Sequence, residues 1–166
     1  MADLVSKGNL VVLVIPIDAA APKGRIILPQ QLVLREVLDK GGIALCCQPS
    51  ELAVTLQNLK TPPKVVITDS QVFSKVKEIV PDSVNLTSFS ILMARHKGTL
   101  GDAIAAAEAV NNLADGDKIL IAEGCTHHRQ CDDIGTVKLP RWLKAHTGKD
   151  IIIETTSGKG YPDDLS

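Results

Sequence analysis

The densest group of potential ligands in the chain is segment 124–135, which reads Gly-Cys-Thr-His-His-Arg-Gln-Cys-Asp-Asp-Ile-Gly. It contains two of the four cysteines and two of the four histidines, next to a pair of aspartates. Thiolate and imidazole together form the ligand set of zinc, copper and iron–sulfur clusters. Cys125 and His127 are close enough in sequence to share one metal, and His128 and Cys131 are further candidates. The segment therefore predicts a metal or cluster site.

Other interpretations of this segment stay open. Cys125 could be a nucleophile with His127 or His128 as its base, which would make the chain a small α/β enzyme. The segment could also serve a zinc-binding interaction module, or be a polar loop that hydrogen-bonds itself. Cys-x-His alone is a weak motif, because the chain has no Cys-x-x-Cys and the spacing from Cys125 to Cys131 matches no standard zinc finger.

Several polar or aromatic residues elsewhere have simpler interpretations. Glu123 is either a solvated carboxylate or a hard, exchangeable metal ligand. Asp132 is expected to stabilise a helix dipole from its first turn, by about 0.3–1 kcal/mol. His96 and His146 are expected to cap the carboxyl ends of helices. Trp142, the only tryptophan, is predicted to be a core residue or an interface anchor.

The elements around the segment are a predicted strand and a predicted helix. Residues 118–122 form an apolar run, and residues 137–146 form an amphipathic helix with Pro140 in its first turn. Ligands gather at the carboxyl ends of strands in parallel α/β sheets. Cys125 would lie at such an end, where loop N–H groups and a helix N-terminus favour the thiolate.

A strand–helix alternation runs through the rest of the chain, and such alternation is typical of parallel sheets. Residues 10–17 are continuously apolar, as in a strand buried on both faces. One predicted helix places Leu32, Val33, Val37 and Leu38 on its apolar face and ends at a glycine cap. The other predicted strands are 42–48, 64–69, 84–88 and 150–155, and the other predicted helices are 52–59 with Ser50 as N-cap, 70–80, 89–96 and 100–113.

We therefore expect an α/β fold with two small Rossmann-like domains, each built on a parallel sheet. Residues 1–95 would hold four strands, and residues 96–166 only two clear strands. A two-stranded sheet cannot bury itself, so the second sheet is expected to be incomplete. The first sheet has unprotected edges that can pair across a two-fold axis, which predicts a homodimer through residues 1–95.

Composition argues against several classes of protein. Hydrophobic residues make up 45% and aromatic residues 2%, which predicts an aliphatic core. A net charge of −1 with scattered Lys and Arg argues against binding to nucleic acid or anionic membranes. No apolar run reaches the about 18 residues of a membrane span, and the N-terminus does not resemble a signal peptide. We expect a cytoplasmic protein with free thiols, in which Cys46 and Cys47 are small buried strand residues.

Five stretches of the chain together carry a family resemblance. They are Val-Val-Leu-Val-Ile-Pro-Ile-Asp at 11–18, Ala-Pro-Lys-Gly-Arg-Ile-Ile-Leu-Pro-Gln at 21–30, Thr-Asp-Ser-Gln-Val-Phe at 68–73, Leu-Thr-Ser-Phe-Ser-Ile-Leu at 86–92, and the block 121–142 that contains the candidate ligands. These stretches resemble the HydF family, the maturation GTPase and scaffold of [FeFe]-hydrogenase. The last block is the most specific, because a ligand segment and its flanking helix match together.

The resemblance implies that residues 1–95 are a dimerisation domain and residues 96–166 a C-terminal cluster-binding domain. Family members also carry an N-terminal GTPase domain. This chain has no Gly-x-x-x-x-Gly-Lys-Ser/Thr, so GTP would bind only in a domain that is missing here. In the family, Cys-x-His is joined by a downstream His-Cys-x-x-Cys to hold a [4Fe–4S] cluster. Cys125 and His127 match the first part, and the second does not occur in this chain.

The resemblance therefore implies a scaffold fragment, truncated at both ends, and not an enzyme. Its parent would hold the [4Fe–4S] cluster and deliver a di-iron precursor to the [FeFe]-hydrogenase, with the other maturation proteins as partners. The fragment is not expected to hold the cluster stably, because such sites normally use three or four thiolates. It could still take up a stray metal at Cys125, His127 and His128, and Glu123 is expected to be a weak exchangeable ligand in the intact protein.

Overall fold

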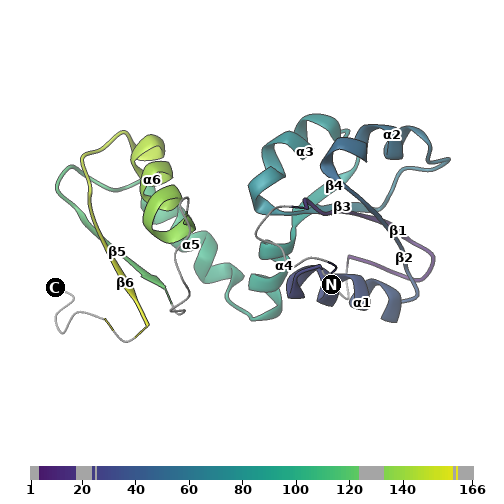
Figure 1. Ribbon diagram of the computed structural model, residues 1–166, viewed down its shortest axis with the longest axis horizontal. Helices are drawn as coiled ribbons and strands as arrows, with labels where there is room; N and C mark the ends of the chain where they lie inside the picture. Colours follow the sequence, from purple (N-terminus) through teal and green to yellow (C-terminus); the bar gives the residue numbers. More distant parts are fainter. Residues whose placement is uncertain (1–3, 18–23, 25, 124–132, 159, 161–166) are drawn as a thin grey trace. The chain divides into compact units, whose positions relative to one another are not determined.

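The computed structural model describes residues 4–17, 24, 26–123, 133–158 and 160 (Figure 1). The chain divides into two units, Met1–Gly101 and Asp102–Ser166. The boundary falls inside helix α5 (Leu100–Val110), a few residues beyond the predicted one at 95/96. Each unit is built on a parallel sheet, which confirms the predicted α/β class with two parallel sheets.

The first unit contains a four-stranded parallel sheet in the order β2-β1-β3-β4. Its strands are β1 (Leu10–Val14), β2 (Ile43–Cys47), β3 (Val65–Thr68) and β4 (Asn85–Ser88). The central strands β1 and β3 are buried almost throughout, whereas β2 and β4 are edge strands. Burial on both faces explains why β1 and β3 are continuously apolar in sequence.

Helices cover both faces of this sheet (Figure 1). Val11 and Leu13 of β1 pack against α1 (Leu28–Asp39) and α4 (Phe89–His96). Val12 and Val14, which point the other way, pack against α2 (Leu52–Gln57) and α3 (Phe73–Ile79). Because successive side chains of β1 point to opposite faces of the sheet, the core has two layers, one on each face. Short 3₁₀ turns, η1 (Pro49–Glu51) and η2 (Ser70–Val72), precede α2 and α3.

Helix α1 ends in the predicted glycine cap. Gly41 adopts a positive φ of 69°, its N–H donates to the Leu38 carbonyl, and the Gly42 N–H donates to the Val37 carbonyl at 2.9 Å. This pair of bonds satisfies the last carbonyls of the helix. The predicted apolar face of α1 is only half right. Val33 and Val37 are buried, but Leu32 and Leu38, which flank that stripe, are largely exposed.

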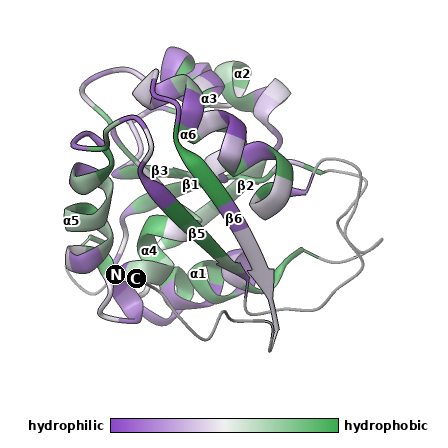
Figure 2. Cartoon of the chain, turned by 90° about the vertical axis from the view of Figure 1, so that its left-hand side faces the viewer, coloured by the Kyte–Doolittle hydropathy of each residue, from purple (hydrophilic) through white to green (hydrophobic). Residues whose placement is uncertain are grey.

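The second unit contains two parallel strands, β5 (Lys118–Glu123) and β6 (Ile152–Ser157), as predicted. Figure 2 shows the apolar run of β5 beside that of β6. A π-helical turn, η3 (Ile134–Lys138), leads into helix α6 (Leu139–Thr147), which carries Pro140 in its first turn as predicted. Among the described residues of this unit, the buried ones are Ile121, Gly135, Ile151 and Thr156.

Two local predictions from the sequence are wrong, and a third is narrowed. Ser50 does not cap a helix, because its hydroxyl donates to the Glu51 carboxylate at 2.6 Å and Gln48 occupies the cap position of η1. Cys46 is exposed and Cys47 half-buried, because β2 is an edge strand. Of the two roles predicted for Trp142, its 47% exposure excludes a core residue and leaves the interface anchor. Within the described part of the chain, no helix is long and apolar enough to cross a membrane.

Candidate functional site

The candidate ligand segment begins directly at the carboxyl end of β5. Strand β5 ends at Glu123 and the turn η3 begins at Ile134, so the two ends of the segment are described. Cys125, His127 and His128 lie between them, within residues 124–132, and fall outside the described residues together with Cys131 and Asp132. The segment thus follows a parallel strand at its carboxyl end, which is where the sequence places it.

Glu123 is the one predicted ligand that the structure describes, and its side chain reaches toward η3. A Cβ atom built on Gly135 would have three Glu123 side-chain atoms as its nearest neighbours: Oε1, then Cδ at 2.7 Å and Cγ at 3.1 Å. Glu123 is half-buried and Gly135 is buried. The Glu123 carboxylate at the end of β5 therefore packs on the Gly135 backbone in η3.

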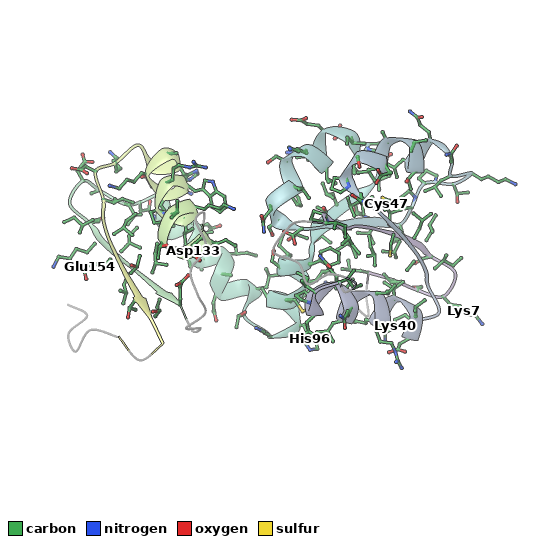
Figure 3. All side chains as sticks on the ribbon, viewed as in Figure 1. Lys7, Lys40, Cys47, His96, Asp133 and Glu154 are labelled. Atoms are coloured by element: carbon green, nitrogen blue, oxygen red, sulfur yellow. The ribbon has the colours of Figure 1, made fainter. Side chains whose placement is uncertain are left out.

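Asp133 fixes the start of η3. Its Oδ2 accepts hydrogen bonds from both the N–H and the hydroxyl of Thr136, each at 2.8 Å. Its carbonyl oxygen accepts from the N–H groups of Val137 and Lys138, and the second of these bonds gives the turn its π-helical width. Figure 3 shows Asp133 near the base of α6. Asp133 therefore acts as a helix cap, the kind of role predicted for its neighbour Asp132.

The two predicted helix-capping histidines differ in their surroundings. The His146 Nε2 atom lies 2.8 Å from Asn111 Oδ1, just past the end of α5, so His146 ties α6 to that end. His96 is exposed as the last residue of α4, where a cation is favourable.

The described residues do not assemble a metal site by themselves. Among them, no group of three or more His, Cys, Asp or Glu side chains is placed to hold a metal ion. Any such site in the second unit would therefore need residues outside the described part of the chain, where Cys125, His127 and His128 lie. On either side of segment 124–132 the structure describes the end of β5, the Glu123–Gly135 contact and the Asp133 cap.

A separate hollow lies in the first unit, at the carboxyl ends of β1 and β2. Its volume is about 540 Å³, and it is lined by Ile15, Ile17, Ile26, Cys46, Cys47, Gln48, Glu51 and Thr55. Figure 3 shows Cys47 at the sheet on the side of α2. Burial raises the pKa of the Cys46 thiol. Burial also raises the pKa of Cys47, with the Glu51 carboxylate adding to the rise and a hydrogen bond with Thr55 opposing it.

Raised pKa values predict slow alkylation of Cys46 and Cys47, because the thiolate is the reactive form. At the same neutral pH, we expect iodoacetamide to modify both cysteines several-fold more slowly in the folded chain than in urea. The rate in the folded chain should then climb at a higher pH than the rate in the unfolded chain. Peptide mass spectrometry over a pH series measures both profiles. Coincident midpoints in the two states would contradict the prediction.

Sequence reasoning missed the capping role of Asp133 and the contact between Glu123 and Gly135. Asp133 has a recognisable signal, an aspartate directly before a helical turn with a threonine three residues later. The pairing of Glu123 with Gly135 has no sequence signal, because it depends on the tertiary arrangement of β5 and η3.

The fold and the site together define a class of protein. It is a two-unit α/β protein in which a Cys-His segment follows the carboxyl end of a parallel strand. Residues 1–98 match the family model described as the hydrogen maturase F dimerization domain. Residues 101–166 match the family model described as the hydrogen maturase F tetramerization domain. The chain therefore belongs to the hydrogen maturase F (HydF) family, which confirms the resemblance seen in the sequence. No curated protein matches the chain in sequence.

Both family descriptions name an assembly role. They support self-association of this chain and a scaffold role in hydrogenase maturation, as expected from the resemblance. Residues 1–95, expected to dimerise, fall within the first match. Residues expected to bind a cluster fall largely within the second match, whose description names assembly alone, so cluster binding stays a prediction.

Proposed function

We propose that this chain is the assembly region of a hydrogenase maturation scaffold and supplies part of a [4Fe–4S] site. The observation that carries the proposal is that both halves of the chain match domains of hydrogen maturase F. The position of the Cys-His segment at the carboxyl end of β5 supports the second part. In the intact protein, this region would present a di-iron precursor to the [FeFe]-hydrogenase, in the cytoplasm and with the other maturation proteins as partners.

The residues present fit part of a cluster site. Cys125 and His127 would supply a thiolate and an imidazole at one side of the cluster. Such clusters are held mainly by thiolates, usually three or four. Cys46 and Cys47 belong to the other unit, and their raised pKa values disfavour the thiolate. The resemblance implies that the remaining ligands come from a His-Cys-x-x-Cys motif, which this chain does not contain.

Replacing Cys125 with serine in a version that includes this motif is expected to abolish most cluster binding. The reason is that loss of one thiolate leaves too few ligands to hold a cubane cluster. Anaerobic reconstitution with iron and sulfide, followed by iron and sulfide analysis and absorption spectroscopy, measures the effect.

Cys46→Ser in the same background is the matched control and should load like the parent. A parent protein that stays colourless after reconstitution would refute cluster binding and leave the assembly role untouched. Equal loading of the parent and Cys125→Ser would remove Cys125 from the ligand set.

A further inference from the structure

We propose that two copies of this chain pair antiparallel through β2 in a single register, centred on Leu45, in which Ile43 of each copy covers the hollow beside Cys47 of the other. The proposal rests on the assembly role proposed above. It adds the residues that meet and a use for the hollow at the carboxyl ends of β1 and β2. The match of residues 1–98 to a dimerization domain indicates a second copy as the partner.

The charges at the two ends of β2 favour antiparallel pairing. A two-fold axis normal to the sheet continues it into a second copy and places the amino end of one β2 beside the carboxyl end of the other. Lys40 follows α1 just before β2, and Lys7 lies beside Gly41, where its Cγ is 3.2 Å from a Cβ built on the glycine. Glu51 follows β2 at the other end. Each end therefore attracts the opposite end of the second copy.

The outward backbone groups of β2 define the register. Ile43 donates its N–H to the Asn9 carbonyl, just before β1, so the alternate residues Ala44 and Cys46 direct their backbone groups outward. Residues directly opposite each other in an antiparallel pair exchange two hydrogen bonds when both face outward. Centring the pair on Leu45 places Ala44 of each copy opposite Cys46 of the other. This register therefore contains two complete pairs.

The neighbouring registers are less complete. A shift of one residue would oppose outward and inward backbone groups, so the nearest alternatives are shifts of two residues. Each of these keeps one complete pair, and its next bonds fall on Gly42 or Gln48. The Gly42 N–H already donates to the Val37 carbonyl at 2.9 Å. The Gln48 carbonyl already accepts from the Glu51 N–H at 3.1 Å. The register centred on Leu45 therefore uses the outward groups of β2 best.

The same register brings Ile43 to the hollow. Ile43 and Cys47 of the two copies lie opposite each other as a pair without hydrogen bonds, with Cα atoms about 4.5 Å apart. Both side chains lie on the face of the sheet that α2 covers, since Leu45 and Cys47 pack against the core layer on that face. Cys47 lines the hollow together with Glu51 and Thr55. Ile43, which is 57% exposed in one copy, therefore loses exposed surface in the dimer.

Disulfide trapping on the full chain tests the register. Ile43→Cys places a thiol at an exposed position opposite Cys47 of the second copy, and Cα atoms about 4.5 Å apart are within the range of a disulfide. With oxidised glutathione as the oxidant, we expect a linked dimer in which peptide 41–60 is joined to a second copy of itself through positions 43 and 47. Non-reducing electrophoresis and peptide mass spectrometry measure this linkage.

Three matched controls should stay unlinked at this edge. The wild-type chain and Ile43→Cys combined with Cys47→Ser have no cysteines opposite each other in the proposed register. Ile91→Cys places a thiol at a 43% exposed position of α4, which follows the opposite edge strand, and should not link through position 91. A wild-type chain linked through two Cys46 residues would place the register two residues away and overturn the proposal.

Light scattering separates the register from the assembly role. A dimeric Ile43→Cys chain that does not link through positions 43 and 47 would overturn the register and leave the assembly role intact. A monomeric wild-type chain at micromolar concentration would overturn both. If Ile43→Cys itself is monomeric, or unfolded by circular dichroism, Ala44→Cys keeps Ile43 and places its thiol opposite Cys46 of the second copy. Absence of that linkage would then overturn the register.

Alkylation of the linked Ala44→Cys dimer tests the cover over the hollow. We expect iodoacetamide to modify Cys47 roughly tenfold more slowly in this dimer than in the same dimer carrying Ile43→Ala, because Ile43 restricts access to the thiol. Ile91→Ala, which removes the same atoms from α4, should keep the slow rate. Equal rates with and without Ile43→Ala would overturn the cover.

Discussion

Replacing Leu13 with alanine is expected to lower the unfolding free energy of the first unit by about 2–5 kcal/mol. Leu13 is fully buried in the middle of β1, a central strand, and packs within the core layer under α1 and α4. Removing its side chain leaves a cavity that strands on both sides of β1 prevent from collapsing. Urea denaturation followed by circular dichroism measures the loss.

Leu38→Ala is the matched control, because it removes the same atoms from a side chain that is 54% exposed. A surface change of this kind is expected to cost less than about 0.5 kcal/mol. If the two substitutions had equal effects, the assignment of β1 to the centre of the core would be wrong. The pair also tests the correction to the apolar face of α1, on which the sequence placed Leu38.

The second large effect is expected at the open edge of β2. The Ile43 N–H donates to the Asn9 carbonyl at 2.8 Å, and the Cys47 carbonyl accepts from the Ile15 N–H at 2.9 Å. Alternate residues of a strand direct their backbone groups to the same side, so those of Ala44 and Cys46 point away from β1. Ile43 is also 57% exposed. Among the described strands none pairs with this side of β2, and an apolar edge strand is a template for a second copy.

The opposite edge of the sheet is less suitable for pairing. Strand β4 is polar, and the Asn85 side chain donates to the Lys64 carbonyl at 3.3 Å. It also runs directly into α4, with Ser88 as the cap of that helix. We therefore expect the predicted homodimer to form through β2.

Cys46→Pro is expected to raise the dissociation constant of this dimer by about 100-fold or more. The proline removes an outward N–H and its ring clashes with the paired strand, and the two-fold axis repeats both effects in the second protomer. The fold of the protomer should survive, since proline is tolerated on an edge strand where the N–H faces outward. Light scattering during size-exclusion chromatography measures the mass at micromolar concentration, and circular dichroism checks the fold.

Cys46→Ala should stay dimeric, and Leu45→Pro should unfold the unit because the Leu45 N–H faces β1. If proline at 46 disturbs the fold, Cys46→Lys places a charge on the same edge and leaves the backbone intact. A folded Cys46→Pro or Cys46→Lys chain with the dimer's mass would exclude β2 as the interface.

Much of the fold follows from hydrophobic patterning. The run at 10–17 predicts a strand buried on both faces, and β1 occupies Leu10–Val14 at the centre of the sheet. The helix predicted at 89–96 forms over the same residues. What patterning cannot supply is the order of the strands. Cys46 and Cys47 look like core residues in an apolar run, and only the order β2-β1-β3-β4 reveals that their strand lies at the edge.

The site was predictable only in part, for a similar reason. A cluster of soft ligands after an apolar strand is visible in the sequence, and so is the aspartate before the next helix. The contact between Glu123 and Gly135 depends on tertiary geometry across twelve positions of chain, and no local pattern encodes it. The sequence therefore indicates Glu123 as a candidate ligand but does not indicate its contact with Gly135.

The small interior of the second unit has a consequence for how this part of the chain folds. Its described residues include four buried ones, while Ile104, Ile134, Val137, Trp142 and Ile152 are large apolar side chains that remain substantially exposed. So little burial leaves little free energy to offset the entropy of ordering the backbone. A copy that covers these side chains would stabilise the folded form by mass action. Folding and assembly of this unit then form one equilibrium, and its position is set by the concentration of protomers.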